Sequence, residues 1–331
     1  MPAADTTDRM TMWAAAMRDE RYGDAWALAE RTLAARDPAT RDDPALPYHL
    51  RWVWDGRAVD GRDVLVRCYH GLGDTIQFAR FLPMLASRAA SVTLEVQPAL
   101  QGILASVARN AALVPFDPAR PLPPAEVDVE IGELAFALRA TPADAPLPYV
   151  AASPAALPAG TIGLCHTTGN WDTDRRLSSD LLAPLCRIAP CITLVPEPTD
   201  LDVLNPEGCT GDIDATAALV AGVDLVVTVD TMIAHLAGAM DKPTWLLLKA
   251  EPDWRWAPDR PGSAWYPSMR LYPQARAGDW GSVIDRVSRD LARRGDATTS
   301  SPGRSRERLT CDSAAPRALR QSQTPDPEEA A

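Results

Sequence analysis

The residues best suited to chemistry lie between Asp224 and Pro243, in the stretch DLVVTVDTMIAHLAGAMDKP. A continuous apolar run, Leu225 to Val229, predicts a strand buried on both faces of a parallel sheet. At Asp230 and Thr231 the run stops, and the apolar spacing changes to that of a helix, which both residues are well suited to begin. Free backbone N–H groups and the positive end of the helix dipole would then meet at the edge of the sheet. Such a turn favours the binding of a diphosphate.

The donors at this turn would be the backbone amides of Thr231, Met232 and Ile233, which do not depend on side-chain type. His235 lies one turn into the predicted helix, on the same face as Thr231, and could orient the turn. The alternative is an ordinary strand-to-helix turn with a packed histidine.

A glycine turn, His70-Gly71-Leu72-Gly73-Asp74, follows a second apolar run from Asp63 to Tyr69, and a helical pattern begins at Ile76. The dinucleotide-binding fingerprint G-x-G-x-x-G would need a small residue where Ile76 stands. The turn therefore argues against an oxidoreductase that uses a nicotinamide or flavin.

Strands and helices alternate on both sides of a Pro- and Ala-rich stretch at 141–160. Strands are predicted at 92–96, 113–116, 127–131, 161–166, 191–195 and 244–248, and helices at 98–109, 132–138, 179–188, 212–220 and 279–294. This alternation indicates βαβ units and parallel sheets. We therefore expect an α/β protein with one domain at 51–140, a linker at 141–160 and a second domain at 161–294.

The two ends of the chain differ from this middle part. Helical periodicity over residues 11–36, broken at Arg21-Tyr22-Gly23-Asp24, predicts a helical hairpin within residues 1–50. Its apolar spacing is similar to half of a tetratricopeptide repeat, but such arrays need about three repeats. We expect a single vestigial hairpin docked on the next domain. Residues 295–331 are polar and rich in Pro, Ser and Arg, which predicts a disordered tail.

The composition narrows the possible partners. A net charge of −11 over 331 residues makes nucleic acid an improbable partner. No apolar run approaches the ~20 residues of a membrane span, and the N-terminus lacks the pattern of a secretory signal. We expect a cytoplasmic protein without a transmembrane segment, with peripheral membrane contact left open. No Cys/His cluster has zinc-site spacing and no D-x-D pair stands at a strand end, so neither a metal nor a cofactor is expected.

Three motifs resemble those of heptosyltransferase-like glycosyltransferases, similar to glycosyltransferase family 9, in the branch often fused to tetratricopeptide repeats. VDTMIAHLAGAMDKP is similar to that family's VDT-x-x-AHLAGALGKP, GLGDTIQFARFLP to its GLGDTIQFARYLP, and DWRW with SAWYP to its PDWRW and SPWYP. The motifs occur in the expected order over roughly residues 52–287. The resemblance implies a GT-B fold, two facing Rossmann-like domains that often end in a helix returning to the first domain.

The activity that the resemblance implies is inverting, metal-independent sugar transfer. The donor would be a nucleotide-diphosphate sugar, and the acceptor hydroxyl would belong to a glycan, a lipid-linked molecule or a protein. By resemblance Asp74 is the general base, and a carboxylate at a helix start beside an interdomain cleft suits that role. The alternative is that Asp74 only caps the helix, which would depress its pKa.

The resemblance also implies a set of donor contacts in the second domain. Thr167, Thr168 and Asn170 would donate hydrogen bonds to the phosphates, and either Arg175 or Arg176 would neutralise the leaving diphosphate. Arg255 is expected to touch the donor, whereas the tryptophans at 256 and 265 are expected to pack the loop at 249–267.

The sequence departs from the family at two places. Tyr69-His70 replaces the usual Glu-Gln, so that His70 could assist proton transfer, contact the acceptor or be a neutral change. The stretch DRRLS at 174–178 keeps one arginine of the usual D-R-x-R-S. These departures leave a rival hypothesis: a non-catalytic nucleotide-sugar-binding or scaffold protein with the same fold.

Overall fold

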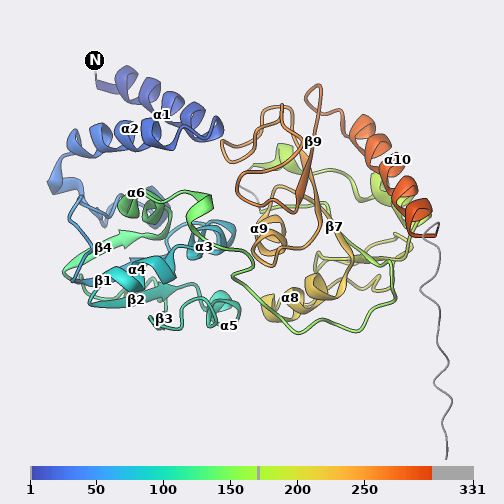
Figure 1. The fold of residues 1–331 in the computed structure, drawn as a ribbon, viewed down its shortest axis with the longest axis horizontal. Coiled ribbons are helices and arrows are strands. Elements are labelled where there is room, and N and C mark those ends of the chain that lie inside the picture. The colour runs from blue at the N-terminus through green and yellow to red at the C-terminus, as the bar shows by residue number, and fades with distance from the viewer. Residues whose placement is uncertain (1, 170–171, 300–331) are drawn as a thin grey trace, which may run out of the picture.

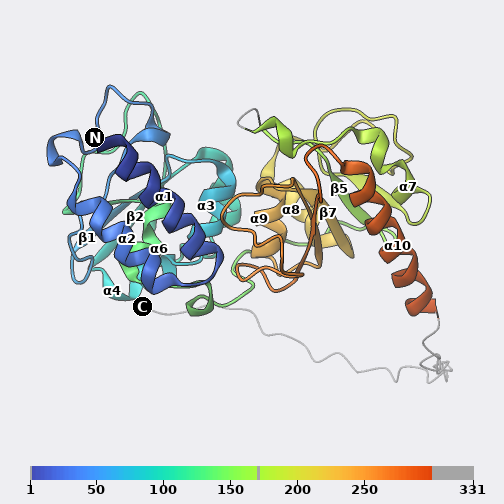
Figure 2. The same cartoon turned by 90° about the horizontal axis from the view of Figure 1, so that it is seen from above.

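Two parallel β-sheets lie side by side, and a helical hairpin covers the first of them (Figure 1, Figure 2). The structure is a computed structural model that describes residues 2–169 and 172–299. Asn170 and the part of the predicted tail from residue 300 onward lie outside the described residues. This architecture confirms the predicted α/β fold with two Rossmann-like halves.

The first sheet has the strand order β3-β2-β1-β4, and every neighbouring pair is parallel. Its strands are β1 (Asp63–Arg67), β2 (Ser91–Val96), β3 (Ala112–Pro115) and β4 (Val127–Glu130), and its helices are α3 (Leu72–Ala79), α4 (Leu82–Arg88), α5 (Gln101–Leu104) and α6 (Leu134–Leu138). The central strand β1 is buried from Val64 to Arg67, as expected for a strand covered on both faces.

The second sheet has the order β6-β5-β7-β8-β9, again all parallel. Its strands are β5 (Ile162–Cys165), β6 (Cys191–Thr193), β7 (Leu225–Val229), β8 (Thr244–Leu248) and β9 (Met269–Pro273), and its helices are α7 (Ala183–Cys186), α8 (Ile213–Gly222), α9 (Met232–Ala239) and α10 (Trp280–Thr299). Every residue of β7 and β8 is buried, which agrees with the continuous apolar runs.

Some predicted elements differ from those observed. The helix expected at 98–109 reduces to a 3₁₀ turn, Pro98–Leu100, followed by the single turn of α5, which contains Gly102. Strand β9 was not predicted, because it follows a long loop and contains the exposed Arg270 at a sheet edge. Asp212 caps α8, because its side chain accepts hydrogen bonds from the amides of residues 214 and 215.

The resemblance implied a last helix that returns to the first domain. Helix α10 does not do so, and this expectation was wrong. The buried side chains Val283, Ile284 and Val287 belong to the apolar cluster of the second sheet, together with Leu185 and Tyr272. The helix also continues past residue 294 to Thr299, into the predicted tail.

The N-terminal hairpin makes the crossing instead. It consists of α1 (Pro2–Arg18) and α2 (Tyr22–Ala34). On the first-sheet side, the ring of Trp26 stacks on Phe136 with centroids 5.9 Å apart. On the second-sheet side, the ring of Trp13 lies edge-on to Trp254 at 4.9 Å. The hairpin therefore contacts both halves of the molecule.

The linker at 141–160 is also fixed to both halves. The backbone amides of Tyr149 and Val150 donate to the carbonyl of Ala239 at 3.0 and 3.2 Å, and the hydroxyl of Tyr149 donates to the carbonyl of Ile76 at 3.0 Å. In the described part of the chain, none of the helices combines the length and apolarity needed to cross a bilayer.

Candidate functional site: two strand-to-helix turns

The turn from β1 to α3 and the turn from β7 to α9 meet between the two sheets (Figure 1). Gly73 is the point of contact. A Cβ atom on Gly73 would lie 2.8 Å from the His235 ring and 3.4 Å from the Cα atom of Met232. The glycine turn therefore brings the first turn of α3 directly against the first turn of α9, and both candidate motifs come together.

Asp74 lies in this contact with its side chain 30% exposed. Its Oδ2 atom accepts a hydrogen bond from the Gly71 amide at 3.2 Å, and Oδ1 forms an ion pair with Arg255. Asp74 therefore caps α3 and still borders open space, so the two roles considered for it are compatible in this structure.

Arg255 links the loop after β8 to α3. Its Nε donates to the side chain of Gln77 at 2.6 Å, and Nη1 pairs with Asp253 at 2.8 Å. Burial acts to lower the pKa of Arg255, but the carboxylates of Asp253 and Asp74 have the larger combined effect, so the pKa is raised overall. The guanidinium thus stays charged and ties the two halves together beside the candidate base.

Arg175 is the arginine that faces the α9 turn. Its Nη1 donates to the Asp230 carbonyl at 3.1 Å and lies 3.5 Å from the Asp230 carboxylate. Burial raises the pKa of Asp230, and the charge of Arg175 opposes that shift. The neighbouring Arg176 donates instead to the Thr168 carbonyl at 2.7 Å. Of the two arginines that the sequence left open, Arg175 is the one beside the predicted diphosphate turn.

Lys249 was missed by the sequence reasoning. Its Nζ lies 2.7 Å from the Asp172 carboxylate, which Arg175 also approaches at 3.6 Å. Burial acts against ionisation of Asp172, but Lys249 and Arg175 together lower its pKa. The sequence could have indicated this lysine, because Lys249 directly follows the predicted strand 244–248. The carboxyl ends of parallel strands lie at one edge of the sheet, where the site was expected.

The helix start at α9 keeps its backbone donors clear of a side-chain cap. Thr231 occupies the N-cap position but its side chain makes no capping hydrogen bond. Thr231 and Met232 are half-buried and Ile233 is buried. The first amides of the helix are therefore not used by the Thr231 hydroxyl.

The two threonines after β5, Thr167 and Thr168, form their hydrogen bonds within their own loop. The Thr168 hydroxyl donates to the Gly169 carbonyl at 2.9 Å, and the Thr167 carbonyl accepts a hydrogen bond from the Cys165 thiol at 3.6 Å. They lie on the loop that carries Arg175, whereas the third predicted member of the set, Asn170, is not described.

His235 is buried behind the turn rather than open to it. Its Nδ1 lies 3.1 Å from the Tyr266 hydroxyl, and its ring stacks on Trp256 at 5.7 Å. Burial, and then the charges of Arg255 and Arg175, hold its pKa well below the usual value, so the imidazole is neutral. Trp256 and Trp265 are buried as expected, with exposed fractions of 0% and 3%.

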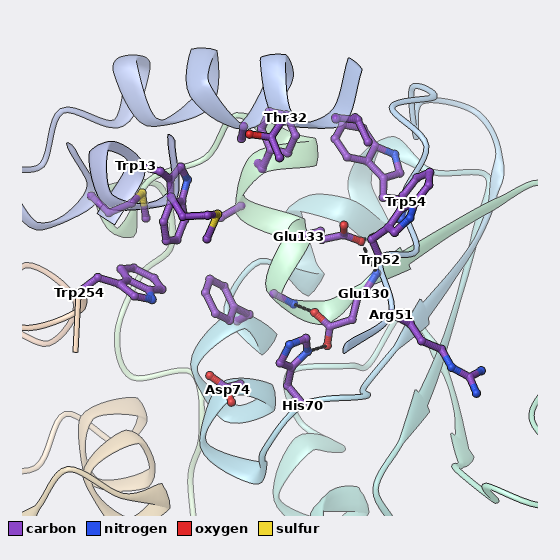
Figure 3. Close-up of a pocket in the computed structure, with 18 of the residues that line it drawn as sticks. Trp13, Thr32, Arg51, Trp52, Trp54, His70, Asp74, Glu130, Glu133 and Trp254 are labelled. Atoms are coloured by element: carbon purple, nitrogen blue, oxygen red, sulfur yellow. Dashed lines mark hydrogen bonds and ion pairs between the residues drawn. The ribbon is translucent and has the colours of Figure 1, made fainter. Parts of the chain in front are cut away.

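His70 pairs with a carboxylate at the end of β4. Its Nδ1 lies 2.9 Å from Glu130 Oε1 (Figure 3). Burial acts to lower the pKa of His70, but the hydrogen bond and charge of Glu130 raise it overall. Beside this pair, burial and then the charge of Glu130 raise the pKa of Glu133 from 4.5 to about 7. Sequence reasoning missed both glutamates: Glu130 lies near the end of the predicted strand 127–131, and Glu133 follows that strand by two residues.

A cavity of about 490 Å³ opens beneath the hairpin and reaches His70, Asp74 and Arg255 (Figure 3). Seven of its lining residues are tryptophan or phenylalanine: Trp13, Trp26, Trp52, Trp54, Phe78, Phe136 and Trp254. Within the described ranges, no group of three or more His, Cys, Asp or Glu side chains could hold a metal ion.

The chain is similar to known glycosyltransferases in part of its sequence and in its fold. Residues 210–260, which contain the β7–α9 turn and Arg255, match the model of glycosyltransferase family 9 (heptosyltransferase). The iron-containing dodecameric glycosyltransferase TibC from enterotoxigenic E. coli is similar in structure, with a TM-score of 0.52, 12% identity, and coverage of 72% of this chain and 78% of TibC. The ADP-heptose lipopolysaccharide heptosyltransferase II of E. coli gives a TM-score of 0.50 with 13% identity, covering 71% of this chain and 99% of that one.

The fold is therefore that of the GT-B heptosyltransferases. The family match at the β7–α9 turn confirms the resemblance to glycosyltransferase family 9, whereas the tetratricopeptide-fused branch stays a prediction. The protein FlbA of Caulobacter vibrioides is 32% identical over 102 residues, which cover 30% of this chain and 17% of FlbA. The chain thus spans only a small part of that relative.

Proposed function

We propose that this protein is a glycosyltransferase that moves a sugar from a nucleotide-diphosphate sugar to an acceptor hydroxyl. The observation that carries the proposal is the contact at Gly73, which joins the candidate base Asp74 to the α9 turn and its neighbours Arg175 and Lys249. The family match covers that turn. We further propose that the reaction inverts the anomeric centre, needs neither metal nor cofactor, and takes place in the cytoplasm.

In this mechanism the acceptor oxygen attacks the anomeric carbon from the side opposite the diphosphate. A carbon–oxygen bond to the acceptor forms while the bond to the donor phosphate breaks, and the proton of the hydroxyl passes to Asp74. The diphosphate leaves with the electron pair. Its growing negative charge would be met by the first amides of α9 and by Arg175 and Lys249.

The cations of the site must exchange partners for this to happen. Arg255 pairs with Asp74, Arg175 with both Asp172 and Asp230, and Lys249 with Asp172. A bound diphosphate would attract these cations away from the carboxylates, since it carries more charge than one carboxylate. Release of Arg255 from Asp74 would also leave that carboxylate oxygen free to accept the proton of the acceptor hydroxyl.

A structure of similar fold suggests which donor nucleotide to test first. One structure of TibC, with a TM-score of 0.51 and 11% identity over 72% of this chain and 78% of that one, was determined with ADP-D-β-D-heptose. We propose that this chain likewise takes a nucleoside diphosphate sugar, and an adenosine diphosphate sugar is the first candidate to test.

Thermal unfolding with ADP, UDP and GDP, and with their sugars, tests the proposal. We expect one nucleotide to raise the melting temperature, and its sugar form to be consumed with release of the nucleoside diphosphate when an acceptor is present. If none of these compounds stabilises the protein, the proposed function is wrong.

A nucleotide-sugar-binding scaffold without transfer activity is the second candidate. The observation that favours it is the engagement of Asp74 by both Arg255 and the Gly71 amide. A scaffold would bind the nucleotide but release no nucleoside diphosphate, and Asp74→Asn would then change nothing.

A further inference from the structure

A smaller pocket lies in the second half of the molecule, between strand β9 and helix α10. Its volume is about 290 Å³, and four arginines line it: Arg270 from the strand, and Arg286, Arg289 and Arg293 from the helix. Helix α10 lies at the end of the molecule away from the first sheet (Figure 1, Figure 2). This arginine pocket is therefore separate from the two turns of the candidate functional site.

The helix places its three arginines in one row. Arg286, Arg289 and Arg293 follow one another at spacings of three and four residues, and side chains at these spacings are neighbours on a helix surface. Like charges at these spacings repel each other and destabilise a helix. A bound anion would offset this repulsion.

One carboxylate lies among the arginines and holds two of them in place. Asp290 lies 2.6 Å from Arg270 and 3.3 Å from Arg293. Its carboxylate also accepts a hydrogen bond from the Tyr272 hydroxyl at 3.0 Å. Among the described residues that line the pocket, Asp290 alone is acidic. Four positive charges and one negative charge give the pocket a net charge of +3, whereas the whole chain carries −11.

The other two arginines, Arg286 and Arg289, keep donors for a ligand. Within the described ranges, neither forms an ion pair with a carboxylate. Arg286 donates to the Pro273 carbonyl, and Arg289 donates through Nε to the Asp285 carbonyl at 3.1 Å. Arg286 is half-buried and Arg289 is exposed. Since a guanidinium has about five N–H donors, each of these hydrogen bonds leaves most of the donors unused.

The charge and the donor geometry of the pocket favour a phosphate group. Planar guanidinium groups bind phosphate and carboxylate oxygens through pairs of parallel hydrogen bonds. A phosphate monoester carries about −1.5 to −2 charges near neutral pH and has three strong acceptor oxygens, so it matches a net charge of +3 better than a single carboxylate does. The volume lies at the lower end of the range of about 300–1,000 Å³ that is typical of small-molecule pockets. The pocket therefore fits a small phosphate-bearing group.

We propose that the arginine pocket is an anion site that binds a terminal phosphate group, carried either by a small molecule or by a lipid headgroup. In both cases Arg286 and Arg289 would bind the phosphate oxygens, while Asp290 keeps Arg270 and Arg293 in the wall of the pocket. The proposal goes beyond the proposed function and does not depend on it, because the residues that line the pocket differ from those of the two turns.

A phosphorus NMR titration of the full chain tests this proposal. The probes are methyl phosphate, which has a terminal phosphate group, and dimethyl phosphate, which carries a single charge. Acetate is added as a competitor. We expect methyl phosphate to bind about tenfold or more tightly than dimethyl phosphate, and acetate to displace it poorly. Equal Kd values for the two phosphates would contradict a site for a terminal phosphate.

Matched variants locate the binding. The double variant Arg286→Gln with Arg289→Gln should raise the Kd of methyl phosphate about tenfold or more. The control is Arg21→Gln with Arg120→Gln, which removes the same charge from two exposed arginines of the first half and should leave the Kd unchanged. Because Arg286 also holds the Pro273 carbonyl, Arg289→Gln is measured alone as well and should raise the Kd by a smaller factor. Equal Kd values for the double variant and the control would overturn the proposal.

Vesicle sedimentation distinguishes the two sources of the phosphate. The vesicles consist of phosphatidylcholine with phosphatidic acid, and vesicles of phosphatidylcholine alone are the blank. Cosedimentation that is lost in the double variant would assign the site to a lipid headgroup. Binding of methyl phosphate without cosedimentation would assign it to a small molecule. If the protein binds neither probe, or if the double variant retains the binding in full, the proposal is wrong.

A reciprocal comparison separates this site from the proposed donor site. The double variant should keep the full thermal shift with the nucleoside diphosphate, and Arg175→Ala should keep the wild-type Kd for methyl phosphate. Loss of methyl phosphate binding in Arg175→Ala would place the anion at the α9 turn and overturn the second site, with the proposed function intact. Absence of any nucleotide shift in the wild type would instead overturn the proposed function alone.

Discussion

The β1–α3 turn and the β7–α9 turn have the same plan but different exposure. Each follows a buried parallel strand, each carries an aspartate near the helix start, and each aspartate pairs with an arginine. The side chain of Asp74 is 30% exposed, whereas that of Asp230 is 7% exposed. An accessible carboxylate can exchange a proton with a substrate, whereas a buried one can hold an arginine in place. This difference in burial supports the different tasks that we propose for the two turns.

Of the variants that test the difference between the two turns, Asp74→Asn is expected to have the largest effect. Asp74→Asn should lower kcat by about 10²- to 10⁴-fold, because the amide cannot accept the proton of the acceptor. The thermal shift with the donor nucleotide should stay as in the wild type. Release of nucleoside diphosphate from the sugar donor measures kcat, and an unchanged rate would remove Asp74 from the chemistry.

The second turn is tested through its arginine. Arg175→Ala should weaken the binding of the nucleoside diphosphate by about 10- to 100-fold, which corresponds to the loss of a charge-assisted hydrogen bond. Arg176→Ala is the matched control, since that side chain points to the Thr168 carbonyl. Isothermal titration should show the larger loss for Arg175→Ala, and the reverse order would exchange the roles of the two arginines.

The contact between the turns can be broken at Gly73. Gly73→Ala would place a Cβ atom 2.8 Å from the buried His235 ring, so the turns must move apart. We expect a loss of about 1–3 kcal/mol in the free energy of unfolding, as for other overpacked sites. Gly281→Ala meets no atom within 4 Å and should cause no loss. Denaturant unfolding of both variants decides whether the turns are in close contact in solution.

The last prediction concerns Glu133, which lies just beyond the end of β4. The pKa of Glu133 rises on folding from 4.5 to about 7, so the folded state binds the proton more tightly and stability falls as pH rises through that window. Glu133→Gln keeps the shape and should remove about 1–3 kcal/mol of this fall. Unfolding measured between pH 4.5 and 6.5 avoids the contribution of His70, whose raised pKa adds stability that is lost only above its usual titration range. Equal slopes in both proteins would contradict the assignment.

The sequence predicts those parts of the molecule that local pattern determines. Strands β7 and β8 have the predicted bounds, because a continuous apolar run between polar turns leaves little choice. The motifs also predict which loops meet at the site. The hairpin's contact with both halves could not be predicted, since it depends on tertiary packing of Trp13 against Trp254. The docking of α10 was wrong for the same reason, because an amphipathic face does not identify its partner.

The pairing of charged side chains could likewise not be predicted from the sequence. The choice between Arg175 and Arg176 follows from which one reaches Asp230, and adjacent residues of a loop give no period from which to infer this. The ion pair between Arg255 and Asp74 joins residues that are 181 positions apart.

A crystal structure of the protein with its nucleoside diphosphate is the most direct test of the account. We expect the diphosphate oxygens to accept hydrogen bonds from the Met232 and Ile233 amides, with Arg175 turned toward them and Asp74 facing the cavity beneath the hairpin. A nucleotide bound away from the start of α9, with Arg175 still paired to Asp230, would contradict it.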